Sequence, residues 1–266
     1  MARRNTTLPP SLKYEALSAI TECEVQSIQG YQMMNPGKPM PEPFSPQDFV
    51  NLVSLGQQTF HESIMQLADM NCLYTSESPA DNDLICTELL VNEEDFFDPR
   101  YDYDFTDIDD GTEEFKRGSE PYARPCGWNR IALKVRDKYP DGNRWLGTGP
   151  DSWPVSYHGT SVEGAKGIIQ SHYKPGNGMG YGRGVYSTPD ISTALRYSNT
   201  FTSKTTGKTY NVIIQNRINP QRRKIPSETE WLVPVPAGTS FDEQRKIVES
   251  AIRSYGLLLR EVQHQA

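Results

Sequence analysis

Three short stretches decide the fold expected for this chain: Tyr157-His158-Gly159-Thr160, Gly184-Val185-Tyr186-Ser187 and Glu230-Trp231-Leu232-Val233. The first two have the composition of short buried strands, each carrying a side chain that could do chemistry. The third alternates in the manner of a further strand and begins with a carboxylate. We therefore expect His158, Tyr186 and Glu230, each from a different strand, to form a three-part site.

The residues around these stretches predict short helices and further strands. A compact helix with a cap at Thr160 or Ser161 should follow His158, and Thr188-Pro189-Asp190 should begin another. Strands are expected over 210–218, 230–235 and 256–259, and the capping box of Ser240 and Glu243 should open a last helix. Regular crossover helices mostly do not link the strands, so the pattern predicts an α+β fold rather than a doubly wound sheet.

The N-terminal half differs in its proline content and its charge. Its prolines limit order in residues 1–44 apart from a helix over 12–28, and Ser45-Pro46 starts a second helix. Residues 81–115 hold 14 Asp/Glu against one Arg, which predicts a solvated linker; the spacing of its oxygens does not fit a calcium loop. We expect an N-terminal arm and helical region over 1–80, an acidic linker over 81–118 and a folded domain over 119–266. Aromatic residues within the linker could let it lie against the basic part of the protein.

Composition limits the class of protein. The net charge of −7 conceals a balance of +10 over residues 116–266, so this part could attract an anionic ligand. The four cysteines include no CxxC pair, and no ligand cluster indicates a metal site. No secretory signal or membrane-spanning run is evident, which predicts a cytoplasmic or nuclear protein that does not interact with membranes. The oligomeric state cannot be predicted.

A glycine-rich loop occupies residues 176–184, with glycine at every second position. It matches no nucleotide-binding fingerprint, because it precedes a strand instead of opening a helix and has no GxxxxGK[ST] pattern. Its glycines would permit close approach of backbone to a ligand, although a plain surface loop is the simpler interpretation.

The order of these motifs resembles the catalytic core of the poly(ADP-ribose) polymerase-type ADP-ribosyltransferases. His158-Gly159-Thr160 is followed by a helix, a loop, Gly182-Arg183-Gly184-Val185-Tyr186 and then Tyr197. Glu230-Trp231-Leu232-Val233 is similar to the segment that carries the family's glutamate. The resemblance covers roughly residues 155–235 and implies a split antiparallel β core that binds NAD+.

The resemblance also implies roles for individual residues. His158 would bond a ribose hydroxyl of NAD+, the backbone of Gly159 would hold the carboxamide, and Glu230 would bond the 2′-hydroxyl and stabilise the cationic sugar. Tyr186 and Tyr197 would enclose the nicotinamide ring. The flanking Thr160 and Gly184 are expected to help bind NAD+.

Two positions leave the interpretation open. Ala194 stands where the family commonly has a serine that bonds the carboxamide, so activity could be reduced or lost. Glu228 is two residues from Glu230 and is an alternative catalytic glutamate.

We expect transfer of a single ADP-ribose to a protein acceptor, or to a nucleic acid, because the domain is small and no regulatory helical domain precedes it. One alternative is an RNA 2′-phosphotransferase-like enzyme, which the basic cluster Arg222-Arg223-Lys224 would suit. The other is an inactive module of the same fold that binds ADP-ribose or a protein, which Ala194 would favour.

Overall fold

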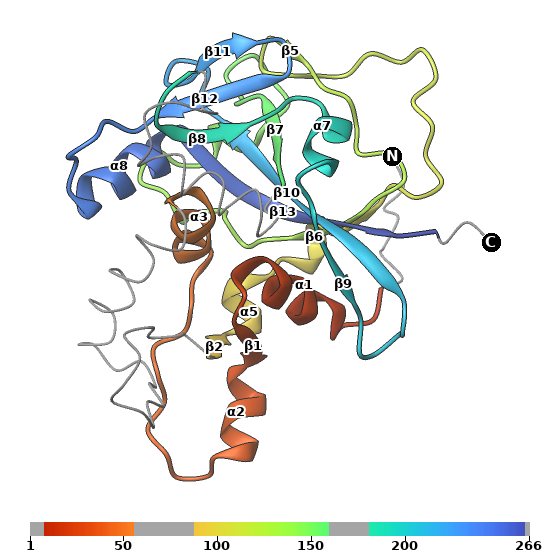
Figure 1. Ribbon diagram of the computed structural model, residues 1–266, viewed down its shortest axis with the longest axis vertical. Coiled ribbons are helices and arrows are strands. Elements are labelled where there is room, and N and C mark those ends of the chain that lie inside the picture. The colour runs from red at the N-terminus through yellow and green to blue at the C-terminus, as the bar shows by residue number, and fades with distance from the viewer. Residues whose placement is uncertain (1–7, 56–87, 160–180, 264–266) are drawn as a thin grey trace.

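The computed structural model describes residues 8–55, 88–159 and 181–263 (Figure 1). The helices are α1 Leu12–Thr21, α2 Ile28–Met34, α3 Pro46–Leu55, α5 Glu93–Phe96, α7 Ile191–Leu195 and α8 Phe241–Ala251, with short 3-10 turns at Pro99–Tyr101 and Arg144–Leu146. The strands are β1 Glu24–Ser27, β2 Glu88–Val91, β3 Tyr103–Asp104, β4 Lys116–Arg117, β5 Glu120–Pro121, β6 Asn129–Ala132, β7 Val155–His158, β8 Gly184–Ser187, β9 Asn199–Thr202, β10 Thr209–Ile218, β11 Lys224–Ser227, β12 Glu230–Pro234 and β13 Ile252–Glu261. In these three ranges, no helix combines the length and the apolar character needed to cross a membrane.

Two antiparallel sheets dominate the molecule. The larger has the order β3-β6-β13-β10-β7, with β9 added to β10, and the smaller has the order β11-β12-β8. They meet at one bridge, where the backbone N–H of Tyr157 donates to Thr188 O at 2.7 Å and that of Thr188 donates to Tyr157 O at 2.9 Å. The α+β class predicted from the sequence is confirmed, and the bridge brings the ends of β7 and β8 together.

Helices α1, α3 and α5 pack with one face of the larger sheet, and α7 lies on the other side (Figure 1). The largest buried cluster joins aromatic and aliphatic residues of these helices, such as Leu12, Phe49 and Phe96, to Ile214 and Leu257 of the sheet. Apolar residues from both sides of the expected boundary at 118 therefore share one core. Burial of this surface from water is the main term that holds the helices in place.

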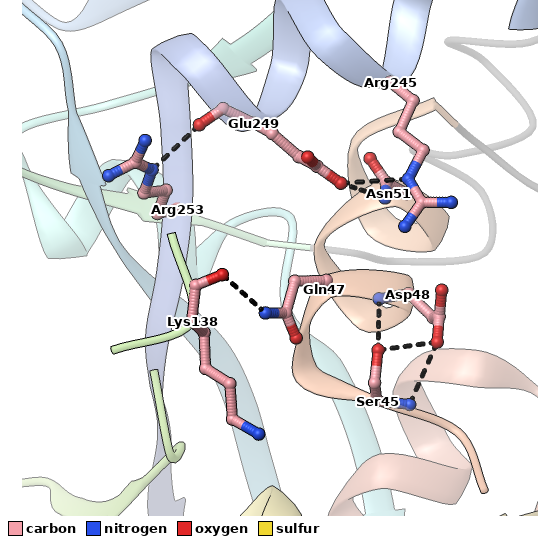
Figure 2. A network of polar contacts seen from close by, with 8 residues as sticks. All are labelled: Ser45, Gln47, Asp48, Asn51, Lys138, Arg245, Glu249 and Arg253. Carbon is pink, nitrogen blue, oxygen red and sulfur yellow. Dashed lines mark hydrogen bonds and ion pairs between the residues drawn. The ribbon is translucent and has the colours of Figure 1, made fainter. Parts of the chain in front are cut away.

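Helix α3 also contacts the part of the fold that carries the smaller sheet. Figure 2 shows Asn51 donating to Glu249 of α8 at 3.1 Å, while Arg253 of β13 donates from Nε to the Glu249 carbonyl at 2.8 Å. Val50 is fully buried in a cluster with Val185 of β8 and Trp231 of β12. An N-terminal helix thus supports the sheet on which the predicted site is built.

The acidic stretch differs from expectation in its described part. Residues 88–104 form β2, α5 and β3 instead of a solvated linker, and Phe96, Phe97 and Phe105 are buried, whereas residues 106–115 form no helix or strand and are mostly exposed. Their aromatic burial outweighs the repulsion among carboxylates that stay at the surface or form ion pairs, such as Glu93 with Lys13. The suggestion that aromatic residues let this stretch lie against the basic part of the protein is confirmed for Phe96 and Phe97, which share a core with Ile131 and Leu133.

Two helix boundaries also differ. The first helix ends at Thr21 and not near residue 28, because Glu22 takes a left-handed conformation (φ 57°) and the chain then continues as β1. The cap of α7 is Asp190 and not Thr188, since its carboxylate accepts from the N–H groups of Ser192 and Thr193. The starts predicted at Ser45-Pro46 and at the Ser240 capping box are confirmed. The helix expected after His158 lies outside the described residues.

Candidate active site

His158 ends β7, and its ring lies against the backbone of β8. Its Nδ1 is 2.7 Å from the carbonyl oxygen of Tyr186. Desolvation lowers the pKa of His158 below its ordinary value, although the bond to Tyr186 acts in the opposite direction. A neutral ring must carry its proton on Nδ1 to donate to a carbonyl, so Nε2 keeps a lone pair. His158 can therefore accept a hydrogen bond from a ligand hydroxyl.

Gly159 continues directly from this strand into a crowded position. A Cβ atom there would lie 2.4 Å from Ala194 O and 2.6 Å from the Tyr197 carbonyl group. Only glycine lets the chain pass so close to the end of α7. This approach places the backbone of Tyr197 beside Gly159, and 52% of the Tyr197 residue surface remains exposed. Tyr197 is therefore accessible from solvent.

Tyr186 occupies the middle of β8 and is half-buried. Its hydroxyl donates to the Gly182 carbonyl at 2.7 Å, which fixes the orientation of the ring. Burial, followed by the charge of Glu230, raises the pKa of Tyr186, so the phenol stays protonated at neutral pH. The effect of Glu230 shows that its carboxylate lies within electrostatic range of this ring.

Glu230 and Glu228 occupy different environments. Glu230 is the first residue of β12 and is half-buried, and Ser227 donates a hydrogen bond to its Oε2 at 3.3 Å. Glu228 lies in the turn between β11 and β12 and is exposed. A carboxylate held in place by a hydroxyl can offset a developing positive charge more effectively than a mobile one. Of the two, Glu230 has the surroundings that this chemistry requires.

Strand register places Tyr186 and Glu230 on the same face of the smaller sheet. Tyr186 lies directly opposite Leu232, and Glu230 is two residues from Leu232 along β12. Opposite residues of antiparallel strands, and residues two apart, share a face. The intervening residues Val185, Trp231 and Val233 point the other way into the core. The ring of His158 joins the pair through its contact with the Tyr186 carbonyl.

Two features of the site had no clear signal in the sequence. Arg183 anchors the entry to β8, with Nη1 bonded to Pro236 O at 2.6 Å and Nη2 to Gln244 at 3.0 Å. From the sequence, Arg183 was only one residue of the motif Gly182-Arg183-Gly184-Val185-Tyr186, with no role of its own. Ser227 could have been found only by recognising the tight turn over 227–230, which brings its hydroxyl to Glu230.

Gly184 has a role apart from loop flexibility. A Cβ atom at this position would lie 2.1 Å from Val233 O. The absence of a side chain lets β8 pair with β12 up to Pro234. Thr160, and the glycine-rich loop before residue 181, lie outside the described residues.

The predicted basic cluster is divided between surface and interior. Arg222 and Lys224 are exposed, whereas the guanidinium of Arg223 stacks 3.6 Å from the Trp231 ring centroid and pairs with Glu120. The guanidinium of Arg223 is therefore held by contacts within the fold and is not free to bind a ligand. Ala194 is also buried, at 1% exposure, among residues such as Tyr157 and Trp128.

Comparison with known proteins adds no assignment. No protein-family model matches the chain, and a search of the curated proteins finds no match either. Any functional assignment therefore rests on the geometry of His158, Tyr186 and Glu230.

Proposed function

We propose that this protein is an NAD+-dependent ADP-ribosyltransferase with an ADP-ribosyltransferase-like split β core. One observation carries the proposal: His158 contacts the backbone of Tyr186, while Tyr186 and Glu230 share a face of the adjoining sheet. These residues are 28 and 44 positions apart in sequence, and the strands that carry His158 and Tyr186 end at the bridge between the two sheets. The order and types of these residues are those of the family that the sequence resembles.

The reaction breaks the bond between the nicotinamide ring nitrogen and ribose C1′. The bonding electron pair leaves with nicotinamide, and an acceptor oxygen or nitrogen forms a new bond to C1′ and releases a proton. The sugar carries positive charge as the bond breaks, and the carboxylate of Glu230, positioned by Ser227, stabilises that charge. The products are nicotinamide, a proton and the ADP-ribosylated acceptor.

The other residues bind and orient NAD+ in this proposal. Nε2 of His158 accepts from a ribose hydroxyl, which its neutral ring permits. Tyr186 and the exposed Tyr197 contact the cationic nicotinamide, since aromatic faces attract a positive ring. The backbone of Gly159 bonds the carboxamide, with Thr160 and Gly184 flanking the ligand. The acceptor in this proposal is a protein that receives a single ADP-ribose, with a nucleic-acid acceptor as the alternative.

Incubation of the full chain with NAD+ labelled in the nicotinamide ring tests the proposal. We expect the wild-type protein to release nicotinamide and Glu230→Gln to release it about 10²- to 10³-fold more slowly. Glu228→Gln is the matched control and should retain the wild-type rate, because that side chain is exposed in the turn. Equal loss in both variants, or no release by a folded wild-type protein, would overturn the proposal.

A binding measurement separates the inactive module. If Ala194 has removed catalysis and left recognition, NAD+ or ADP-ribose will bind without nicotinamide release. NAD+ consumption that occurs only with 2′-phosphorylated RNA would instead indicate the phosphotransferase.

A further inference from the structure

A second polar cluster lies on the larger sheet, on the face shared by Val155 and Tyr157. In the register of β10 with β7, Arg217 is opposite Val155 and Gln215 is opposite Tyr157. Arg217 is only 4% exposed and Gln215 is fully buried. His158, by contrast, is paired with Ile214, whose side chain lies in the core under the helices. The side chain of His158 is therefore on the opposite face of the sheet from the cluster, whereas α7, which leads to Tyr197, packs on the same face as the cluster.

Arg217 is buried without a carboxylate partner in the described ranges. Its Nη1 donates to Trp153 O at 2.6 Å and its Nη2 to Leu146 O at 2.9 Å, but Nε has no partner. Its guanidinium lies 5.3 Å from the centroid of the Tyr255 ring. Two carbonyls and a ring face hold the group in position without neutralising its charge, which is costly in a buried setting.

Two further arginines lie against aromatic rings next to Arg217 and Gln215, and within the described residues each keeps part of its guanidinium unbonded. Arg130 donates from Nε and Nη2 to Tyr101 O at 3.2 and 2.9 Å, and Arg117 donates from Nη1 to Lys116 O at 2.8 Å. Arg130 lies 5.8 Å from the centroid of the same Tyr255 ring, and Arg117 lies 4.5 Å from that of Tyr122.

The amide nitrogen of Gln215 lies 3.4 Å from the hydroxyl oxygen of Tyr122. The amide oxygen of Gln215, Oε1, has no hydrogen-bond partner among the described residues. The buried amide of Gln215 therefore has an acceptor oxygen that no hydrogen bond satisfies, which is costly in this setting.

The nearby carboxylates are already occupied. Glu120 is opposite Arg117 in the β4–β5 hairpin but pairs with Arg223. Asp102 accepts a hydrogen bond from the backbone N–H of Ala132 at 2.7 Å. Burial has the largest effect on the pKa of Asp102 and raises it, whereas the positive charge of Arg130 acts to lower it. No ion pair of Arg117, Arg130 or Arg217 occurs within the part of the chain that the structure describes. Burial lowers the pKa of Arg217, and the positive charges of Arg117 and Arg130 lower it further.

We propose that Arg117, Arg130 and Arg217 form a binding site for a phosphate group. Guanidinium groups match the oxygens of phosphate in geometry and charge, and three of them suit a dianionic phosphomonoester. Arg117, Arg130 and Tyr255 are half-exposed while Arg217 and Gln215 are buried, so the cluster extends from the surface inward. The phosphate belongs to a nucleotide, to a phosphorylated side chain or to the free ion, and the site does not depend on the proposed transfer reaction.

Calorimetric titration of the full chain with inorganic phosphate, at constant ionic strength in chloride buffer, tests this site. We expect the wild-type protein to bind phosphate, and Arg117→Gln and Arg130→Gln each to weaken binding about tenfold. Both residues are half-exposed, so these variants should fold. Arg222→Gln removes an exposed arginine elsewhere and should bind as the wild type does.

A variant that keeps every charge makes the test more specific. A Cβ atom at Gly256 would lie 3.0 Å from Cγ and Cδ of Arg130, so Gly256→Ala should displace that side chain and weaken phosphate binding. Titrations with AMP, adenosine and a phosphoserine peptide distinguish the sources, and adenosine should not bind here. If wild-type protein binds no phosphate, or if Arg117→Gln and Arg130→Gln bind it as tightly as Arg222→Gln, the proposal is wrong.

Discussion

The two faces of the sheet β11-β12-β8 are built for different purposes, although they alternate residue by residue. One face places Val185, Trp231 and Val233 in the core against α8 and β13. The other carries Tyr186 and Glu230, which are half-buried and have polar contacts. Neighbours in sequence thus have opposite roles, so stability and activity should separate between adjacent positions. Substitutions on the two faces can break or sharpen that separation.

The largest effect on stability is expected at Trp231. Trp231→Ala should lower the free energy of unfolding by about 3–5 kcal/mol, because it leaves a cavity in the core and removes the ring under Arg223. Urea denaturation measures this loss. The adjacent Glu230→Gln should change stability by less than about 0.5 kcal/mol, since it removes no buried apolar group. If the two variants unfold at the same urea concentration, the faces are not distinct.

Gly184→Ala should have the next largest effect, because the new methyl group would collide with Val233 O. We expect a loss of about 1–3 kcal/mol in unfolding free energy, together with lower activity from the shifted β8. Thermal unfolding followed by circular dichroism provides the measurement. Gly182→Ala is the contrasting variant, because a Cβ atom at Gly182 would have no other atom of the described residues within 4 Å. The φ of Gly182, 104°, still makes any side chain there unfavourable. A smaller loss at Gly184 than at Gly182 would contradict the role of Gly184 in strand pairing.

The pH dependence of activity should report His158. Its lowered pKa means that the ring stays neutral, with Nε2 free, as the pH falls through 6.5, and that activity declines only below that value. The free energy of unfolding should change in the same direction. As the pH falls, His158 gains its proton in the unfolded chain before it does so in the folded protein. The stability that His158 contributes is therefore fully present above its unfolded pKa and is lost as the pH falls through its folded pKa. Rates and urea midpoints between pH 5 and 8 check both statements. His158→Gln should remove this component, and a loss of activity beginning well above pH 7 would argue against a neutral ring.

The smallest effect is expected at Ser227. Ser227→Ala removes the hydroxyl that positions Glu230 and should slow nicotinamide release a few-fold, in keeping with about 0.5–1.5 kcal/mol for one hydrogen bond. Ser227→Thr keeps a hydroxyl and should restore most of the rate. If both variants behave alike, the hydroxyl does not position the carboxylate.

The sequence predicted the elements whose signals are local. Alternation located β10 and β12, and capping residues located the starts of α3 and α8. It failed where tertiary burial overrode composition: the acidic residues around Phe96 and Phe97 suggested solvent, yet both rings lie in the core. The candidate site residues were named from the resemblance of their motifs to a known family, and their roles stay a prediction. The contact of His158 with Tyr186 and the buried arginines needed three dimensions, since their partners are 28 or more residues away or on backbone carbonyls.

A crystal structure of the Glu230→Gln variant with NAD+ bound tests the central claim most directly. We expect the nicotinamide ring against the ring of Tyr186, a ribose hydroxyl within hydrogen-bond distance of His158 Nε2, and the residue 230 amide beside the 2′-hydroxyl. NAD+ bound elsewhere on the protein, with these three side chains free of it, would contradict the proposed active site.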